Sequence, residues 1–115
     1  MTAGPELDLA VAKACGIEPR VVDKAFRIRP AKDYRRGELF CPSTDLNDAF
    51  LAAGKIGLFD QHAIWRLSSQ RWQIISIGET WDRDAGEIPV VKELCDAETA
   101  PLAICAAILQ TTGNL

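Results

Sequence analysis

The fold of this 115-residue chain is decided by residues 63–78, which read AIWRLSSQRWQIISIG. Successive side chains of a β-strand point to opposite faces of its sheet. Residues 63–67 and 72–78 both alternate in this way, with the polar stretch Ser68–Arg71 between them. Two strands joined by so short a connection pair antiparallel, so the segment is predicted to form a hairpin.

Two further stretches favour strands. Residues 88–95 alternate after a polar turn at 82–87, and residues 25–29 alternate between apolar and basic side chains, which predicts a possible fourth strand. Both alternating sets of the hairpin contain large apolar side chains, with Ile64, Ile75 and Ile77 opposite Trp65, Leu67 and Trp72. Because such side chains are favoured away from water, helices are predicted to cover both faces of the sheet.

Two helices are predicted before the hairpin. Residues 6–15 have apolar side chains at i, i+3, i+4 and i+7, which line one face, and Gly16 follows as the left-handed terminal residue. The second helix is predicted to begin where Ser43 or Thr44 can accept a hydrogen bond from its first turn, and to end at Gly54.

The third helix is predicted from Thr99 to just before Gly113, with Pro101 in its first turn, where a missing N–H costs little. Its large apolar side chains are spread round the axis: Leu102, Ile104, Cys105, Ile108 and Leu109. A helix that is apolar all round is buried on more than one side. Either it lies between the sheet and another helix, or its outer face is a contact with another subunit.

Hairpins with helices before and after them are typical of an α+β domain. The sequence therefore predicts a single domain, residues 1–115, that forms a three-layer α/β/α sandwich with a mainly antiparallel sheet of three or four strands. A composition of 48% hydrophobic and 25% charged residues excludes a collagen-like, disordered or coiled-coil chain.

Neither export nor membrane insertion is indicated. Residues 1–6 have neither the basic start nor the apolar core of a signal peptide. The longest uncharged stretch, Thr99–Leu115, has 17 residues and is broken by proline and glycine, whereas a membrane helix needs about 20 predominantly apolar residues. The four cysteines have no C-x-x-C spacing, so we expect unpaired thiols in a reducing cytoplasm.

Two motifs give the chain a resemblance to a known family. They are CPSTDL at residues 41–46 and AETAPLAICAAIL at residues 97–109. Together with LDLAVA at residues 7–12, Gly16 and the tryptophan-containing hairpin, they make the chain similar to the phage ABA sandwich domain family of small phage and prophage proteins. The resemblance implies helices on both faces of a sheet and a bacterial host, and it implies no activity and no site residues.

No assembled catalytic set is expected. His62 is the only histidine, and a Cys–His nucleophile would need one of the cysteines beside it. The cysteines also lack the paired short spacing of structural zinc sites, and no phosphate-binding loop or hydrolase nucleophile motif occurs. We therefore expect a protein that is not an enzyme and has no metal, cofactor or small-molecule substrate.

One segment differs in charge from the rest of the chain. Residues 20–36 contain seven basic and two acidic side chains, whereas the whole chain has a net charge of -3. A basic patch attracts the phosphates of nucleic acids without sequence preference. The candidate patch consists of Lys24, Arg27, Arg29, Lys32, Arg35 and Arg36. The competing interpretation pairs these charges with acidic groups of the same molecule or of another subunit.

These observations predict a non-catalytic protein–protein interaction module that forms a homo-oligomer, because the last helix is apolar all round. The alternative is an accessory nucleic-acid-binding protein that uses residues 20–36. The tryptophans Trp65, Trp72 and Trp81 are expected in the core and in cross-strand packing rather than on a binding platform.

Overall fold

The structure is a computed structural model that describes residues 1–33, 35, 37–82 and 86–114. Along these residues the elements are α1 (Pro5–Ala14), β1 (Arg20–Val22), β2 (Ile28–Asp33), β3 (Glu38–Leu39), α2 (Leu46–Ile56), the 3-10 helix η1 (Leu58–Asp60), β4 (His62–Arg66), β5 (Trp72–Asp82), β6 (Gly86–Ala97) and α3 (Ala100–Thr111). The α+β class is confirmed, and so are the hairpin and the third strand that follows it.

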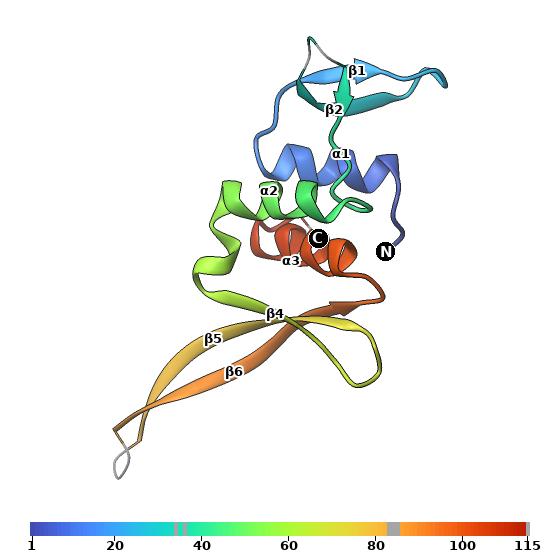
Figure 1. Cartoon of the computed structure of the whole chain (residues 1–115). Helices are drawn as coiled ribbons and strands as arrows, with labels where there is room; N and C mark the ends of the chain where they lie inside the picture. The colour runs from blue at the N-terminus through green and yellow to red at the C-terminus, as the bar shows by residue number, and fades with distance from the viewer. Residues whose placement is uncertain (34, 36, 83–85, 115) are drawn as a thin grey trace.

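The helices lie between two three-stranded sheets (Figure 1). One sheet has the order β1–β2–β3 and lies beside α1, at the top of the view, and the other has the order β4–β5–β6 and lies below α2 and α3. Every strand pair in the described residues is antiparallel. The layer order differs from the expected one, because the helices form the middle layer and each sheet has helices on one face only.

This difference arises from the connection between β1 and β2. Residues 23–27 form a tight turn rather than part of a strand, and β2 begins at Ile28. The turn pairs β2 with β1, so that Val22 lies opposite Ile28. Closing so short a loop costs less chain entropy than pairing with a distant strand. A second sheet therefore forms on the other side of the helices, and no helix is left to cover the far side of the β4–β6 sheet.

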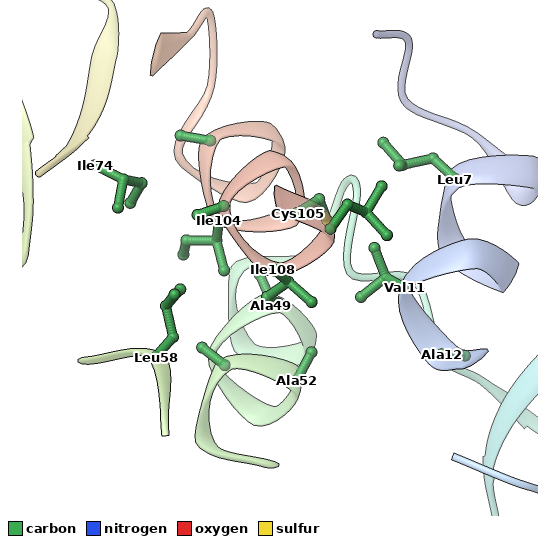
Figure 2. Close-up of a cluster of buried hydrophobic side chains, with 14 of the residues drawn as sticks. Leu7, Val11, Ala12, Ala49, Ala52, Leu58, Ile74, Ile104, Cys105 and Ile108 are labelled. Atoms are coloured by element: carbon green, nitrogen blue, oxygen red, sulfur yellow. The ribbon is translucent and has the colours of Figure 1, made fainter. Parts of the chain in front are cut away.

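The last helix, α3, lies at the centre of the hydrophobic core (Figure 2). Ile104 and Ile108 are fully buried, with Val11 of α1 on one side and Ile74 of β5 on the other. Small side chains of α2 complete the cluster. The first alternative for this helix is thus confirmed, since a sheet and two helices cover it. Among the described residues no helix is both long enough and apolar enough to cross a membrane.

The second helix, α2, differs from prediction at both ends. Its N-cap is Asp45, whose carboxylate accepts a hydrogen bond from a first-turn backbone N–H, in place of Ser43 or Thr44. It continues through Gly54 and stops at Gly57, whose φ of 65° favours glycine. The predicted termini of the other two helices are confirmed, at Gly16 with a φ of 71° and at the N-cap Thr99.

Strands β5 and β6 extend beyond β4 as a two-stranded arm, residues 78–82 and 86–90. The molecule is consequently elongated, with a radius of gyration of 16.3 Å, where a compact domain of this length has about 13 Å. A two-stranded ribbon is marginally stable at best on its own in water. The arm therefore depends for its order on the rest of the sheet.

Candidate functional site

The fold separates the charges of the basic segment. Arg29 reaches towards α1, with Nη2 4.0 Å from Oδ2 of Asp8 and Nη1 3.3 Å from Oδ2 of Asp23. Its side chain is only 12% exposed. Arg27 also pairs with Asp23, through Nε at 2.9 Å. Both guanidinium groups are therefore engaged within the molecule.

Lys32 is engaged on α2. Its Nζ lies 3.0 Å from Oδ1 of the buried Asp48, whose Oδ2 accepts a hydrogen bond from the backbone N–H of Cys41. The hydrogen bond to Asp48 raises the pKa of Lys32. The other predicted patch residues are Lys24 and Arg35, which are exposed, and Arg36, which lies outside the described residues.

The pairs of Arg29 with Asp8 and of Lys32 with Asp48 join the β1–β3 sheet to the helices. Asp8 is buried, and its Oδ1 also accepts a hydrogen bond of 2.9 Å from the backbone N–H of Ser43. Removing one partner of a buried ion pair leaves an uncompensated charge, which is costly. Arg27, Arg29 and Lys32 therefore follow the competing interpretation, in which the basic charges pair with acidic groups of the same molecule.

Asp23 fixes the turn between β1 and β2. Its Oδ1 accepts hydrogen bonds from the backbone N–H groups of Ala25 at 2.8 Å and Arg27 at 3.0 Å. The bond from the Arg27 backbone is the largest cause that lowers the pKa of Asp23. The backbone N–H of Phe26 donates to the Asp23 carbonyl, and that of Asp23 donates to the Arg27 carbonyl, both at 3.0 Å. These are the bonds of a hairpin loop whose last residue is left-handed.

Phe26 occupies that left-handed position, with a φ of 59°, and its side chain is 90% exposed. Glycine is the residue favoured there. Val22 and Ile28 lie opposite each other at the base of the turn and are also exposed. We call Val22, Phe26 and Ile28 the apolar tip. The alternation of residues 25–29 predicted a strand at Phe26 and so gave no sign of this tip, although Asp23 is a residue type that favours the first position of a turn.

A second uncovered surface is the far face of the β4–β6 sheet, the face turned away from the helices. Ile64 and Ile74 pair across the strands and pack on the core, so the side chains one position along point the other way. The large ones on this far face are Trp65, Ile75, Ile77 and Val91. Trp65, Ile77 and Val91 are 47%, 50% and 52% exposed, whereas Ile75 is only 4% exposed. Ile77 and Val91 pair directly across β5 and β6, and Trp65 lies on the same face, opposite Gln73.

The tryptophans differ in environment. Trp72 is half-buried against the core, as predicted. Trp65 lies on the far face, where its indole N–H donates to the side-chain oxygen of Gln73 on the neighbouring strand. The side chain of Trp81 lies outside what the structure describes. Trp65 is thus a cross-strand residue whose ring is still open to a partner.

The four thiols are unpaired, as predicted. Burial is the largest cause that raises the pKa of each of them, to about 11 for Cys95 and about 12 for Cys105. The thiolate is the reactive form of cysteine. These side chains are therefore protonated near neutral pH and serve as small apolar groups.

His62 begins β4, and its Nδ1 lies 2.9 Å from the carbonyl oxygen of Leu58. This contact holds the ring against the main chain at the start of η1. Within the residues that the structure places, no group of three or more histidine, cysteine, aspartate or glutamate side chains is arranged to hold a metal ion.

A surface hollow of about 490 Å³ lies beside the N-terminal segment. We call it the N-terminal hollow. Its apolar lining comes from the half-buried Ala97, Leu102 and Ala106. Asp96 and Glu98 are exposed at its margin, where Arg71 binds Asp96 at 3.0 Å. Polar and apolar groups contribute about equally to its surface, and its lining contains neither histidine nor cysteine.

Comparison with known proteins gives no relative. No protein-family model matches the chain, no curated protein matches it, and no solved structure matches it.

Proposed function

We propose that this protein is a non-catalytic association module and that it associates with copies of itself. The far face of the β4–β6 sheet carries the proposal, because Trp65, Ile77 and Val91 are about half exposed on it while the other face packs on the core. Contiguous apolar patches on a protein surface mark sites of association.

A second copy is the occupant that suits the far face. A two-fold contact needs a surface that is complementary to itself, and an apolar sheet face meets that need, since sheets stack face to face at about 10 Å. Pairing along the edge of β6 is disfavoured at Pro89, which has no N–H to donate. Stacking two far faces would also give each sheet the second covering that its apolar residues require.

The contact is expected to be weak. A stable interface buries about 800 Å² on each partner, and three half-exposed side chains cover less than that. Self-association is therefore reversible and depends on concentration. The sequence motifs at residues 41–46 and 97–109 support a phage or prophage origin, with this association taking place in the cytoplasm of a bacterial host.

Sedimentation velocity over about a hundredfold range of concentration tests the proposal. We expect the sedimentation coefficient to rise with concentration. The double variant Trp65→Ser, Ile77→Ser should weaken association by about tenfold or more, because it removes the central apolar side chains. Leu51→Ser is the matched control, since Leu51 is 46% exposed on α2 and away from the sheet. A wild-type protein that stays monomeric at every concentration would overturn the proposal.

Nucleic-acid binding through residues 20–36 has less support, because Arg27, Arg29 and Lys32 are held in internal ion pairs. A titration of single-stranded DNA at about 50 mM salt tests it, since phosphate contacts are strongest at low salt. Binding that weakens in Lys24→Ala with Arg35→Ala would favour it over self-association, and absence of binding would remove it.

A further inference from the structure

We infer that the apolar tip of one copy is seated in the N-terminal hollow of a second copy. The inference rests on the proposed self-association and adds a second contact to it. The apolar tip is Val22, Phe26 and Ile28, and the N-terminal hollow is lined by Ala97, Leu102 and Ala106 together with Asp96 and Glu98.

Phe26 is placed where neither folding nor local preference favours it. A left-handed backbone is unfavourable for a phenylalanine, and a ring that is 90% exposed gains no packing in return. The turn between β4 and β5 has the same backbone conformation, with a polar residue at the left-handed position. Gln70 has a φ of 67° there, its N–H donates to the Leu67 carbonyl, and the Leu67 N–H donates to the Arg71 carbonyl. Residues that break a local rule without a structural gain are expected at functional sites.

The tip is also held in one conformation. Asp23 accepts backbone hydrogen bonds from Ala25 and Arg27 and pairs with the side chains of Arg27 and Arg29. Leu67, at the corresponding position of the β4–β5 turn, has no side-chain acceptor. A contact surface that is already ordered loses less entropy on binding, so the turn is built to present its aromatic ring.

The N-terminal hollow complements the tip in shape and charge. With a volume of about 490 Å³ and a lining that mixes apolar and polar groups, it has room for the Phe26 ring. Asp96 and Glu98 line it, and Asp96 pairs with Arg71, so that Glu98 adds a negative charge. On the tip Arg27 pairs with Asp23, and Lys24 adds a positive charge. Opposite charges at a contact favour encounter and fix orientation.

Tip and hollow lie along one side of the molecule. In Figure 1 the β1–β2 turn, the N-terminus and the start of α3 are all on the right. A smaller hollow is lined by Arg27 and residues 2–7, and Thr2 and Ala3 of that segment also line the N-terminal hollow. A two-fold axis through this shared segment would place each tip on the hollow of the other copy, so that both contacts form together.

The test is Phe26→Gly, with Gln70→Gly as its matched control. Glycine removes the left-handed strain in both turns, so both variants should melt about 4 °C above the wild type. Only Phe26→Gly should weaken self-association, by about tenfold or more. Because this variant gains stability, misfolding cannot account for the loss. Lys24→Glu should weaken association in the same way, and Glu98→Lys in the partner copy should restore it.

If far faces stack and tips sit in hollows, each copy has two separate contacts, and this determines the size of the assemblies. The wild type should form species larger than a dimer, and Phe26→Gly and the double variant Trp65→Ser, Ile77→Ser should each stop at a dimer. If Phe26→Gly associates like the wild type, or if the far-face variant alone is monomeric, the inference is wrong while the proposed function stands. A monomeric wild type would overturn the proposed function itself.

Discussion

The two sheets are attached to the helical layer by different forces. Ile74 of the β4–β6 sheet is fully buried against Ile104 and Ile108 of α3. The β1–β3 sheet also buries apolar residues, but its links to the helices include the ion pairs of Arg29 with Asp8 and of Lys32 with Asp48. One attachment is apolar and the other is partly ionic.

The difference means that the two ends of the molecule respond to different conditions. Apolar burial has no dependence on the protonation of a side chain, whereas an ion pair is lost when one partner becomes neutral and is weakened by salt when it is near the surface. Asp23 holds the β1–β2 turn, and its pKa is lowered by the hydrogen bond from the Arg27 backbone, so lowering the pH should loosen this turn before the β4–β6 sheet.

The largest expected effect is on the apolar attachment. Ile74→Ala should lower the free energy of unfolding by about 2–5 kcal/mol, since it removes a fully buried side chain and leaves a cavity. Urea unfolding followed by circular dichroism measures it. Ile77→Ala is the control on the other face of the same strand, where the side chain is 50% exposed, and it should cost less than about 1 kcal/mol. Equal costs would contradict the assignment of the two faces.

The next effect concerns pH and Asp23. Its pKa in the folded protein is below the ordinary value, so its stabilising contribution is present above about pH 4 and is lost as the pH falls through the folded pKa. The difference in urea midpoint between the wild type and Asp23→Asn should shrink between about pH 6 and pH 3. The cost of Ile74→Ala should stay constant over that range, and a parallel change in both would contradict the comparison.

The smallest expected effect comes from giving the β4–β5 turn the side-chain acceptor of the β1–β2 turn. Leu67→Asp gives the β4–β5 turn the side-chain acceptor that Asp23 gives the β1–β2 turn. The melting temperature should rise by about 2–4 °C relative to Leu67→Ala, which accounts for the lost leucine. Equal melting temperatures for the two variants would show that the hydrogen bonds of Asp23 do not stabilise such a turn.

The sequence predicted the helices and the hairpin because their signals are local. Apolar spacing identified α1, and Thr99 and Gly16 marked helix ends that the structure confirms. The same reading placed Phe26 in a strand, because a five-residue alternation is also compatible with a turn. It placed the start of α2 at Ser43 or Thr44, one or two residues before the true cap, because all these polar residues can cap a helix.

The candidate surfaces were less predictable. The basic segment was visible as a cluster along the chain, but whether Arg29 and Lys32 face water or Asp8 and Asp48 depends on how α1 and α2 pack against β2. The apolar perimeter of α3 predicted a second covering layer. Its identity, two helices rather than another subunit, required the positions of elements far apart in the chain.

The sequence alone determined the secondary structure of most of the chain and its α+β class, because side-chain periodicity and end signals act over a few residues. The tertiary structure alone decided that helices occupy the middle layer, that Trp65, Ile77 and Val91 remain half exposed, and that Phe26 stands at a tip. Burial depends on contacts between distant segments. Two faces with the same apolar pattern can therefore end in different surroundings, one in the core and one open to a partner.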